Sequence, residues 1–248
     1  NECAKNATGE FLSFLDNDDE LHCNALYYVV KLLNQFKDTD YIYTDEDKID
    51  MKGNHFEAYY KPDYSPELLQ TVMYFLHLIT IRANLFFKIG GFREEYSGAQ
   101  DYDLALRITR HTKNIRHIPE ILYHWRMIPG SAAEKVDAKP YALINAKKAL
   151  EDHVHSKYGS GGYVENGLLT GTFRVRHRIP KNDKVTILIP TNDGERDIEG
   201  RGHVHLVQNL VKSIKEKTSF KNYKIIVIDN GNTSNETKKF LKKMDVSL

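Results

Sequence analysis

Four carboxylates stand within the stretch 16–20, near the start of the chain. The apolar run before them, 11–15, reads as a buried strand. A strand that ends in carboxylates brings them to the edge of a sheet, where open α/β folds bind their ligands. Asp16 and Asp18 could hold one hard divalent cation between them, and that ion would then hold a diphosphate. Alternatively, the last three acids only begin a helix over 21–36, since acidic residues favour helix N-termini.

The composition describes a globular protein with balanced charge. Its 248 residues allow one large domain or two small ones. Hydrophobic residues make up 41% and charged residues 28%, which is enough apolar material for a real core. Lys and Arg number 35 against 34 Asp and Glu, so no electrostatic field indicates a nucleic-acid partner.

Cysteine content and the start of the chain bear on location. Cys3 and Cys23 are too few for a disulfide framework or a structural zinc site, so a reducing compartment fits best and we expect the cytoplasm. No run is long and apolar enough to span a bilayer. The chain begins with Asn1 rather than Met and opens in mid-element, which indicates a piece of something longer. For that parent protein, the inner face of the membrane is the alternative location.

Hydrophobic patterning predicts the elements that position these acids. Residues 40–44 read as a second short strand, which also runs into acids at 45–47. Glycine and proline punctuate 50–68, so we expect a loop there. Further along, we expect a strand and a short helix over 71–88, and helices over 100–111 and 140–155. We also expect a strand over 117–125, which Pro119 marks as an edge strand, and a mobile segment from Gly130 and Ser131.

The character of the chain changes after Pro180. Residues 156–183 read as a linker with an exposed hairpin strand. Residues 184–190 form a β-branched run typical of a buried parallel strand, and a helix, a strand and a helix follow over 206–218, 223–229 and 235–244. The glycine-rich stretch 195–202 is expected to be a charged loop, either a flexible lid or disorder. This second block is the opening half of a nucleotide-binding α/β domain.

Five stretches together resemble the family-two glycosyltransferases, which have the GT-A fold. Phe14–Leu21 (FLDNDDEL) is similar to the family's metal-binding DxD motif, and 90–107 is similar to the segment that carries the ED motif. Residues 117–126, with Gly130 and Ser131, resemble the strand and loop that follow it. Residues 189–194 and 228–231 resemble the first two strand ends of such a domain, which hold the nucleotide. The resemblance implies an α/β fold with a mixed, Rossmann-like GT-A sheet.

The order of these stretches departs from the family, because the nucleotide-binding half comes last. We therefore interpret the chain as a fragment of a tandem transferase: 1–155 is the C-terminal, metal- and acceptor-binding half of one GT-A domain, 156–183 the linker and hairpin, and 184–248 the N-terminal half of the next. In the family the first strand lies beside the DxD strand. We thus predict that 184–190 pairs in parallel with 11–15, within one chain or in a strand-swapped dimer, to give a permuted sheet.

The resemblance implies that a sugar moves from a UDP- or dTDP-linked donor to a saccharide or lipid-linked saccharide acceptor, with inversion. It implies Mn²⁺ or Mg²⁺ held by Asp16 and Asp18, with His124 completing the metal shell. Asp101 is the candidate base for the acceptor hydroxyl, and Gln100 beside it replaces the family's Glu. Without the resemblance, Asp101 would be an ordinary acid in the first turn of a helix.

The second block supplies the candidates for nucleotide binding. By resemblance, Asp193 or its neighbours Pro190, Thr191 and Asn192 reach the nucleoside. Asp229, at the end of the next strand, is expected to reach the uracil or ribose. Asp229 also begins an Asp-Asn-Gly sequence, which reads equally as a plain turn.

A few side chains near the acids stay open in role. Trp125 could stack on a sugar ring. Asp45 and Glu46 either face the donor or acceptor or form a solvated charge run. Three functions remain: a transferase in surface polysaccharide synthesis, a catalytically incomplete carbohydrate- or nucleotide-binding fragment, and a metal-dependent nucleotidyltransferase or phosphotransferase, which also uses acids at strand ends to hold a metal-bound phosphate.

Overall fold

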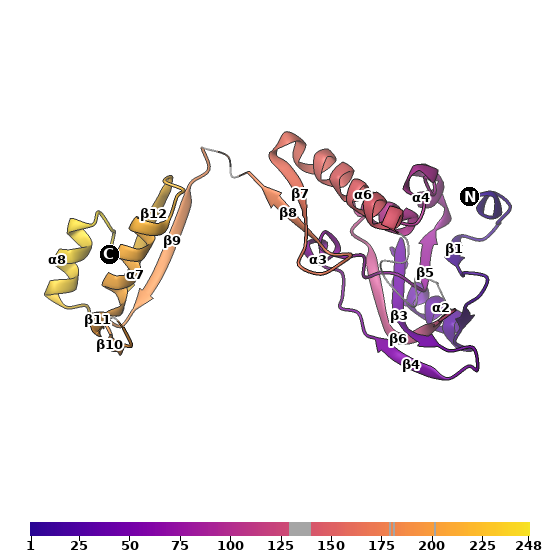
Figure 1. The fold of residues 1–248 in the computed structure, drawn as a ribbon, viewed down its shortest axis with the longest axis horizontal. Coiled ribbons are helices and arrows are strands. Elements are labelled where there is room, and N and C mark those ends of the chain that lie inside the picture. Colours follow the sequence, from indigo (N-terminus) through magenta and orange to yellow (C-terminus); the bar gives the residue numbers. More distant parts are fainter. Residues whose placement is uncertain (129–139, 179, 181, 201) are drawn as a thin grey trace. The chain divides into compact units, whose positions relative to one another are not determined.

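The computed structural model describes the chain except for residues 129–139, 179, 181 and 201. It divides into two compact units, Asn1–Arg178 and Ile179–Leu248 (Figure 1). The mobile segment expected at Gly130 and Ser131 lies outside the described residues. Within the described ranges, no helix has both the length and the apolar character needed to cross a membrane.

The first unit is built on a six-stranded mixed sheet with the strand order β1-β5-β3-β6-β2, and β4 also pairs with β3 (Figure 1). β3 and β6 run parallel, while the other pairs are antiparallel. The strands are β1 Phe11–Phe14, β2 Glu20–Leu21, β3 Tyr41–Ile49, β4 His55–Tyr59, β5 Ile79–Arg82 and β6 Ile115–Arg126.

Helices cover both faces of this sheet. Tyr41 and Tyr43 on β3 point to one face, where they pack with residues of α5 and α6, and Ile42 between them points to the other, where it packs with Val29 of α2. The helices are α1 Glu2–Lys5, α2 Ala25–Gln35, α3 Pro66–Leu69, α4 Ala83–Lys88, α5 Gln100–Ile108 and α6 Pro140–Tyr158, with 3₁₀ turns η1 Glu94–Tyr96 and η2 Gly159–Gly161.

Strand β3 is longer than the sequence predicts. It continues through Asp45, Glu46 and Asp47, which are only 2%, 3% and 8% exposed. The prediction ended this strand at residue 44 because charged residues follow. That boundary was wrong, because residues from distant segments form hydrogen bonds or ion pairs with each of the three buried carboxylates. The loop expected over 50–68 was also wrong in part, since β4 and α3 lie within it.

Strand β6 is internal in the strand order, but β2 reaches only Tyr123 and His124, so the described strand pairs near Pro119 lie on the β3 side alone, as the edge interpretation expected. β3 pairs with it along one side, and β2 pairs with it near its end on the other. Pro119 falls in a register shift between Ile118 and Ile121. Proline lacks the N–H that a regular ladder needs, and a bulge is a place where a sheet tolerates it.

The helices expected over 100–111 and 140–155 are present as α5 and α6. The helix expected from residue 21 begins at Ala25, because Glu20 and Leu21 form β2. The hairpin of β7 Gly162–Asn166 and β8 Phe173–His177 packs with the first unit, whose core includes Val164 and Phe173.

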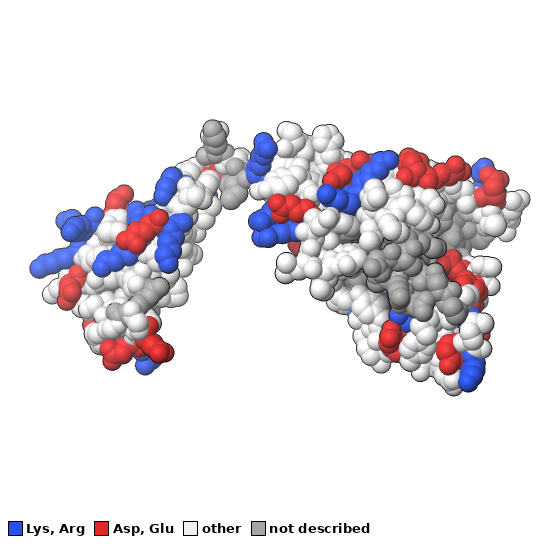
Figure 2. All heavy atoms as spheres, viewed as in Figure 1, with Lys and Arg blue, Asp and Glu red and all other residues white. Residues whose placement is uncertain are grey.

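The second unit has the predicted order of strand, helix, strand and helix. These are β9 Val185–Thr191, α7 Leu206–Lys217, β12 Tyr223–Asp229 and α8 Asn235–Lys243. β9 and β12 pair in parallel over a core that contains Val211 and Leu241. The face of this unit in view in Figure 2 carries many basic side chains, and α8 alone has four lysines.

The loop expected in the second unit is a hairpin, and the strand pairing expected for it stays untested. The stretch 195–202 is not a plain loop, because β10 Glu195–Ile198 pairs with β11 Gly202–His205, and His203 bonds to Glu195 and Asp197 across the hairpin. Among the described strands, β9 pairs with β12 and β1 pairs with β5. The pairing of 184–190 with 11–15 is not among these pairs, and it stays a prediction.

Candidate active site

The four carboxylates after β1 divide into two that are free and two that are held, and Glu20 is held by the Arg126 guanidinium. Asp16 and Asp18 are exposed, and their side chains make no hydrogen bond or ion pair with the described residues. Asp19 is held by both oxygens: Oδ2 accepts from the Tyr123 hydroxyl at 2.5 Å and Oδ1 from the Arg126 amide at 2.7 Å. Burial raises the pKa of Asp19, although both bonds oppose the rise. The oxygens of Asp16 and Asp18 are therefore the ones available to a cation.

Asp101 lies in the first turn of α5, and burial is the main influence on its carboxylate. Burial raises the pKa of Asp101, and the charge of Asp16 adds to the rise. The Tyr102 amide, which donates to Oδ1 at 2.8 Å, and the charge of His77 act in the opposite direction. Gln100 beside it is exposed. The fold thus brings Asp16, from the end of β1, and Asp101, from the start of α5, within electrostatic reach of each other.

A buried network of Glu46, Lys61 and His77 lies beside these carboxylates. Lys61 Nζ donates to Glu46 Oε2 at 2.9 Å and to the carbonyls of Phe75 and His77 at 2.8 and 2.6 Å. The same Glu46 oxygen accepts from the His77 amide at 2.9 Å and lies 3.3 Å from His77 Nδ1. The side chains of Lys61 and Glu46 are 0% and 4% exposed, so water cannot screen this ion pair.

The buried network also sets the charge of His77. Burial works to lower the pKa of His77, but Glu46 outweighs it and the pKa is raised. Burial works to raise the pKa of Glu46, but His77 and Lys61 outweigh it and the pKa is lowered. The His77 ring stacks on Tyr123, with 4.5 Å between ring centroids and 15° between planes. The network therefore favours the protonated form of His77, and the charge of that form lowers the pKa of Asp101.

Sequence reasoning missed Lys61 and His77, and the available signal was weak. His77 interrupts the apolar run 75–79, and Lys61 stands between aromatic residues and Pro62. A lone polar residue in an apolar run is a candidate for a buried, hydrogen-bonded role.

Asp45 and Glu46 do not form the solvated charge run that was one of their two expected roles, and contact of either acid with the donor or acceptor stays a prediction. Both are buried within β3 rather than solvated. Asp45 Oδ1 accepts from the Lys61 amide at 2.9 Å and lies 2.8 Å from His117 Nε2. These acids hold neighbouring segments in place, and Glu46 acts through the buried network rather than as a free carboxylate.

Trp125 follows His124 on β6 and lies near the buried network. Its ring centroid is 5.5 Å from that of His77. It borders a cavity of about 380 Å³, together with Tyr59 and Leu76. Contact of Trp125 with a sugar ring stays a prediction.

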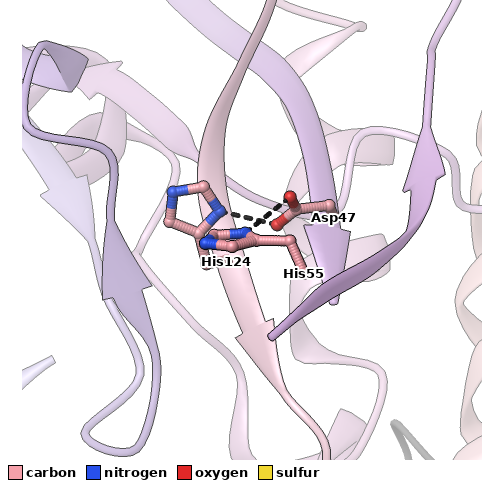
Figure 3. A group of neighbouring side chains, drawn as sticks. All are labelled: Asp47, His55 and His124. Atoms are coloured by element: carbon pink, nitrogen blue, oxygen red, sulfur yellow. Dashed lines mark hydrogen bonds and ion pairs between the residues drawn. The ribbon is translucent and has the colours of Figure 1, made fainter. Parts of the chain in front are cut away.

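His124 belongs to a different group from Asp16 and Asp18. It lies with Asp47 and His55 (Figure 3), and its Nδ1 is 2.6 Å from Asp47 Oδ1. Neither Asp16 nor Asp18 belongs to that group. The metal shell predicted from all three residues is therefore not assembled in this arrangement, although the roles of Asp16 and Asp18 stay predictions.

In the second unit, the ends of the two parallel strands bring Thr191 and Asp229 side by side as register partners. Asp229 Oδ1 accepts from the Gly231 amide at 2.8 Å and from the Thr233 hydroxyl at 2.6 Å, which lowers the pKa of Asp229. This oxygen builds the turn that the Asp-Asn-Gly sequence also indicated. Oδ2 lies 3.9 Å from Lys238 Nζ.

Asp193 is fixed in the same loop region. Its backbone φ is 56°, in the left-handed region, and its Oδ2 accepts from the Ser234 amide at 2.8 Å. Slight burial works to raise the pKa of Asp193, but bonds from Ser234 outweigh it and the pKa is lowered. Asn192 Oδ1 accepts from the Gly194 amide at 3.2 Å, and Pro190 is exposed. The predicted nucleotide contacts thus share one edge of the second unit's sheet.

The chain is similar in sequence to several bacterial proteins, although no family profile matches it. It is 36% identical over 243 residues to the uncharacterized protein y4gI of Sinorhizobium fredii, which covers 97% of the chain and 26% of that protein. It is 31% identical over 229 residues to the O-antigen biosynthesis protein RfbC of Myxococcus xanthus, covering 92% and 17%. It is 31% identical over 121 residues to chondroitin synthase of Pasteurella multocida, covering 48% and 12%. The chain spans about a quarter or less of the length of each of these relatives.

Relatives from Rickettsia carry the name glycosyltransferase. The mixed α/β sheet, with carboxylates at the end of β1 and the start of α5, is that of a GT-A glycosyltransferase. Within this class the chain belongs to family two, as its motifs predict.

Proposed function

We propose that the longer protein transfers a sugar from a nucleotide-diphospho-sugar to a saccharide or lipid-linked saccharide, with inversion, in the synthesis of a surface polysaccharide. The observation that carries the proposal is that the first unit places the unpaired carboxylates of Asp16 and Asp18 after β1 and the carboxylate of Asp101 in the first turn of α5, where the charge of Asp16 acts on it. A base and a cation-binding carboxylate within reach of each other are what sugar transfer from a diphosphate requires. The names of RfbC and chondroitin synthase support a polysaccharide product.

Asp101 is suited to take the proton of the acceptor hydroxyl. A carboxylate with a raised pKa is a stronger base, and burial together with the charge of Asp16 raises the pKa of Asp101. The Tyr102 amide fixes one oxygen of the carboxylate, which leaves the other free for the acceptor. A proton on His77, which Glu46 favours, opposes the rise and so favours the ionised form of Asp101.

Asp16 and Asp18 fit a divalent cation. They offer exposed carboxylate oxygens without protein partners among the described residues, and such oxygens suit Mn²⁺ and Mg²⁺. When bound, such a cation neutralises the charge that develops on the leaving diphosphate. His124 does not join this pair in the present arrangement, because its side chain lies with Asp47 and His55. The proposed cation site therefore consists of Asp16 and Asp18 without the histidine.

We further propose that the second unit binds the nucleotide of a UDP- or dTDP-sugar. The strand ends that carry Thr191 and Asp229 lie side by side, at the edge where α/β sheets bind their ligands. Asp193 and Asn192 build the loop at this edge. The low cysteine content supports a cytoplasmic location for this chemistry.

Calorimetric titration of the chain with UDP, with and without Mn²⁺, tests the cation site. We expect Mn²⁺-dependent binding that Asp18→Asn removes. Asp38→Asn is the matched control, since Asp38 is an exposed acid that precedes β3, at the other end of the sheet. Equal affinity of the Asp18→Asn variant and the Asp38→Asn control would remove Asp18 from the site.

A further inference from the structure

Asp47, His55 and His124 form a compact group of metal-ligand side chains that the proposed transfer does not use (Figure 3). His124 Nδ1 lies 2.6 Å from Asp47 Oδ1, and His55 Nδ1 lies 2.9 Å from Oδ2. Each of the three residues offers one possible ligand atom, and these three atoms all lie within 4.8 Å of one another. The carboxylate thus presents its two oxygens to two imidazoles at once.

Three strands of the first unit's sheet hold this group. Asp47 on β3 and His124 on β6 are register partners in the parallel pair, so their side chains stand next to each other. His55 begins β4, which folds back antiparallel onto β3. Tyr123 and Trp125, which flank His124, point to the opposite face, toward the buried network. The group therefore faces away from Asp101 and its partners.

The group is enclosed on the protein side and open on the solvent side. Asp47 and His124 are each 8% exposed, whereas the His55 side chain is 55% exposed. A cavity of about 460 Å³ adjoins the group and is also lined by His22 and Tyr60. The His22 ring centroid lies 6.0 Å from that of His124, so a further imidazole stands nearby. A cation could enter from solvent and keep water at its open positions.

The donor set favours one class of cation. Imidazole nitrogen suits Zn²⁺ and its transition-metal neighbours, whereas Mg²⁺ and Mn²⁺ suit sites made of oxygen ligands. Zn²⁺ is commonly bound by three protein ligands with water in the fourth position. We propose that Asp47, His55 and His124 bind a transition-metal ion of the Zn²⁺ class, at a site separate from Asp16 and Asp18.

Such an ion ties three strands together. The pairing of β4 with β3 contains a register shift between Glu46 and Lys48, beside Asp47, so the ladder is irregular where the ion binds. A ligand that binds only the folded chain stabilises it, and the first unit is therefore expected to melt at a higher temperature with Zn²⁺. This proposal does not depend on sugar transfer, and its test reads metal binding directly.

The test is a titration of the 248-residue chain with Zn²⁺ in excess Mg²⁺, followed by calorimetry, together with the optical absorption of Co²⁺ as a spectroscopic substitute for Zn²⁺. His55→Ala is the main variant, because His55 is exposed and its loss should leave the fold intact. His111→Ala removes another exposed histidine and serves as the matched control. Asp18→Asn separates this site from the oxygen site.

We expect one Zn²⁺ per chain and a Co²⁺ spectrum typical of nitrogen and oxygen ligands. His55→Ala should weaken Zn²⁺ binding by at least about tenfold and cancel the rise in melting temperature. His111→Ala and Asp18→Asn should bind Zn²⁺ as the wild type does. The proposal is overturned if the wild type binds no Zn²⁺, if His55→Ala binds it with unchanged affinity, or if Asp18→Asn removes the binding.

Discussion

Replacement of Lys61 by Met tests the buried network at its centre. Lys61 Nζ donates to Glu46 and to two backbone carbonyls, and its side chain is 0% exposed. Methionine fills a similar volume but removes the permanent cation from beside Glu46, whose side chain is 4% exposed. Removal of one partner of a buried ion pair costs about 3–5 kcal/mol. We therefore expect the free energy of unfolding of the first unit to fall by about 4 kcal/mol.

Urea denaturation followed by tryptophan fluorescence measures this loss, because the single tryptophan, Trp125, lies in the first unit. Lys48→Met is the matched control: Lys48 pairs with Glu57, their side chains are 25% and 65% exposed, and such pairs contribute about 1 kcal/mol or less. Adding Glu46→Gln to Lys61→Met should recover part of the loss, since the buried charge is gone. If Lys61→Met loses no more stability than Lys48→Met, the network does not stabilise the unit as described.

Three other predictions concern titration and chemistry. Burial, with the charge of Arg110, lowers the pKa of His153 to about 4. In the unfolded chain His153 takes up a proton already near pH 6.5, so the free energy of unfolding is highest above pH 6.5 and falls as the pH drops toward 4. At about 1.4 kcal/mol for each pH unit, the free energy of unfolding falls by about 3 kcal/mol. Urea denaturation at pH 7 and pH 4 measures this fall, which should be smaller in the His153→Gln variant. The pH dependence is opposite for His77, because Glu46 raises the pKa of His77 against the effect of burial. The contribution of His77 to the free energy of unfolding is present below pH 6.5 and is lost as the pH rises. The difference in stability between the wild type and His77→Gln should therefore shrink between pH 6 and pH 9. Asp101→Asn should abolish transfer in a donor-turnover assay of the longer protein while UDP affinity stays unchanged, and retained turnover would exclude Asp101 as the base.

The sequence predicts most elements of the fold, but it places the charged residues of β3 wrongly. Apolar alternation located the beginning of this strand, and the acids at 45–47 then ended the prediction. Charged residues rarely occupy a buried strand unless they are paired. The partners of Asp45 and Asp47 include His117 and His124, more than 70 positions away along the chain, so no local pattern reveals that these acids are satisfied.

The candidate site shows the same division. Asp16 and Asp18 were predicted from a local pattern, a strand followed by acids, and the structure leaves their oxygens free. The association of His124 with Asp47 and His55 depends on the register of three strands, which the sequence does not specify. A resemblance to a motif identifies which side chains carry chemistry, and the pairing of the strands decides which of them meet.

A crystal structure of the chain with UDP and Mn²⁺ bound would show directly whether Asp16 and Asp18 hold the cation. We predict a Mn²⁺ ion on the carboxylates of Asp16 and Asp18, with the diphosphate on that ion and the Asp101 carboxylate facing the same space. A diphosphate held away from Asp16 and Asp18, or a Mn²⁺ ion held by Asp47, His55 and His124 instead, would contradict this prediction.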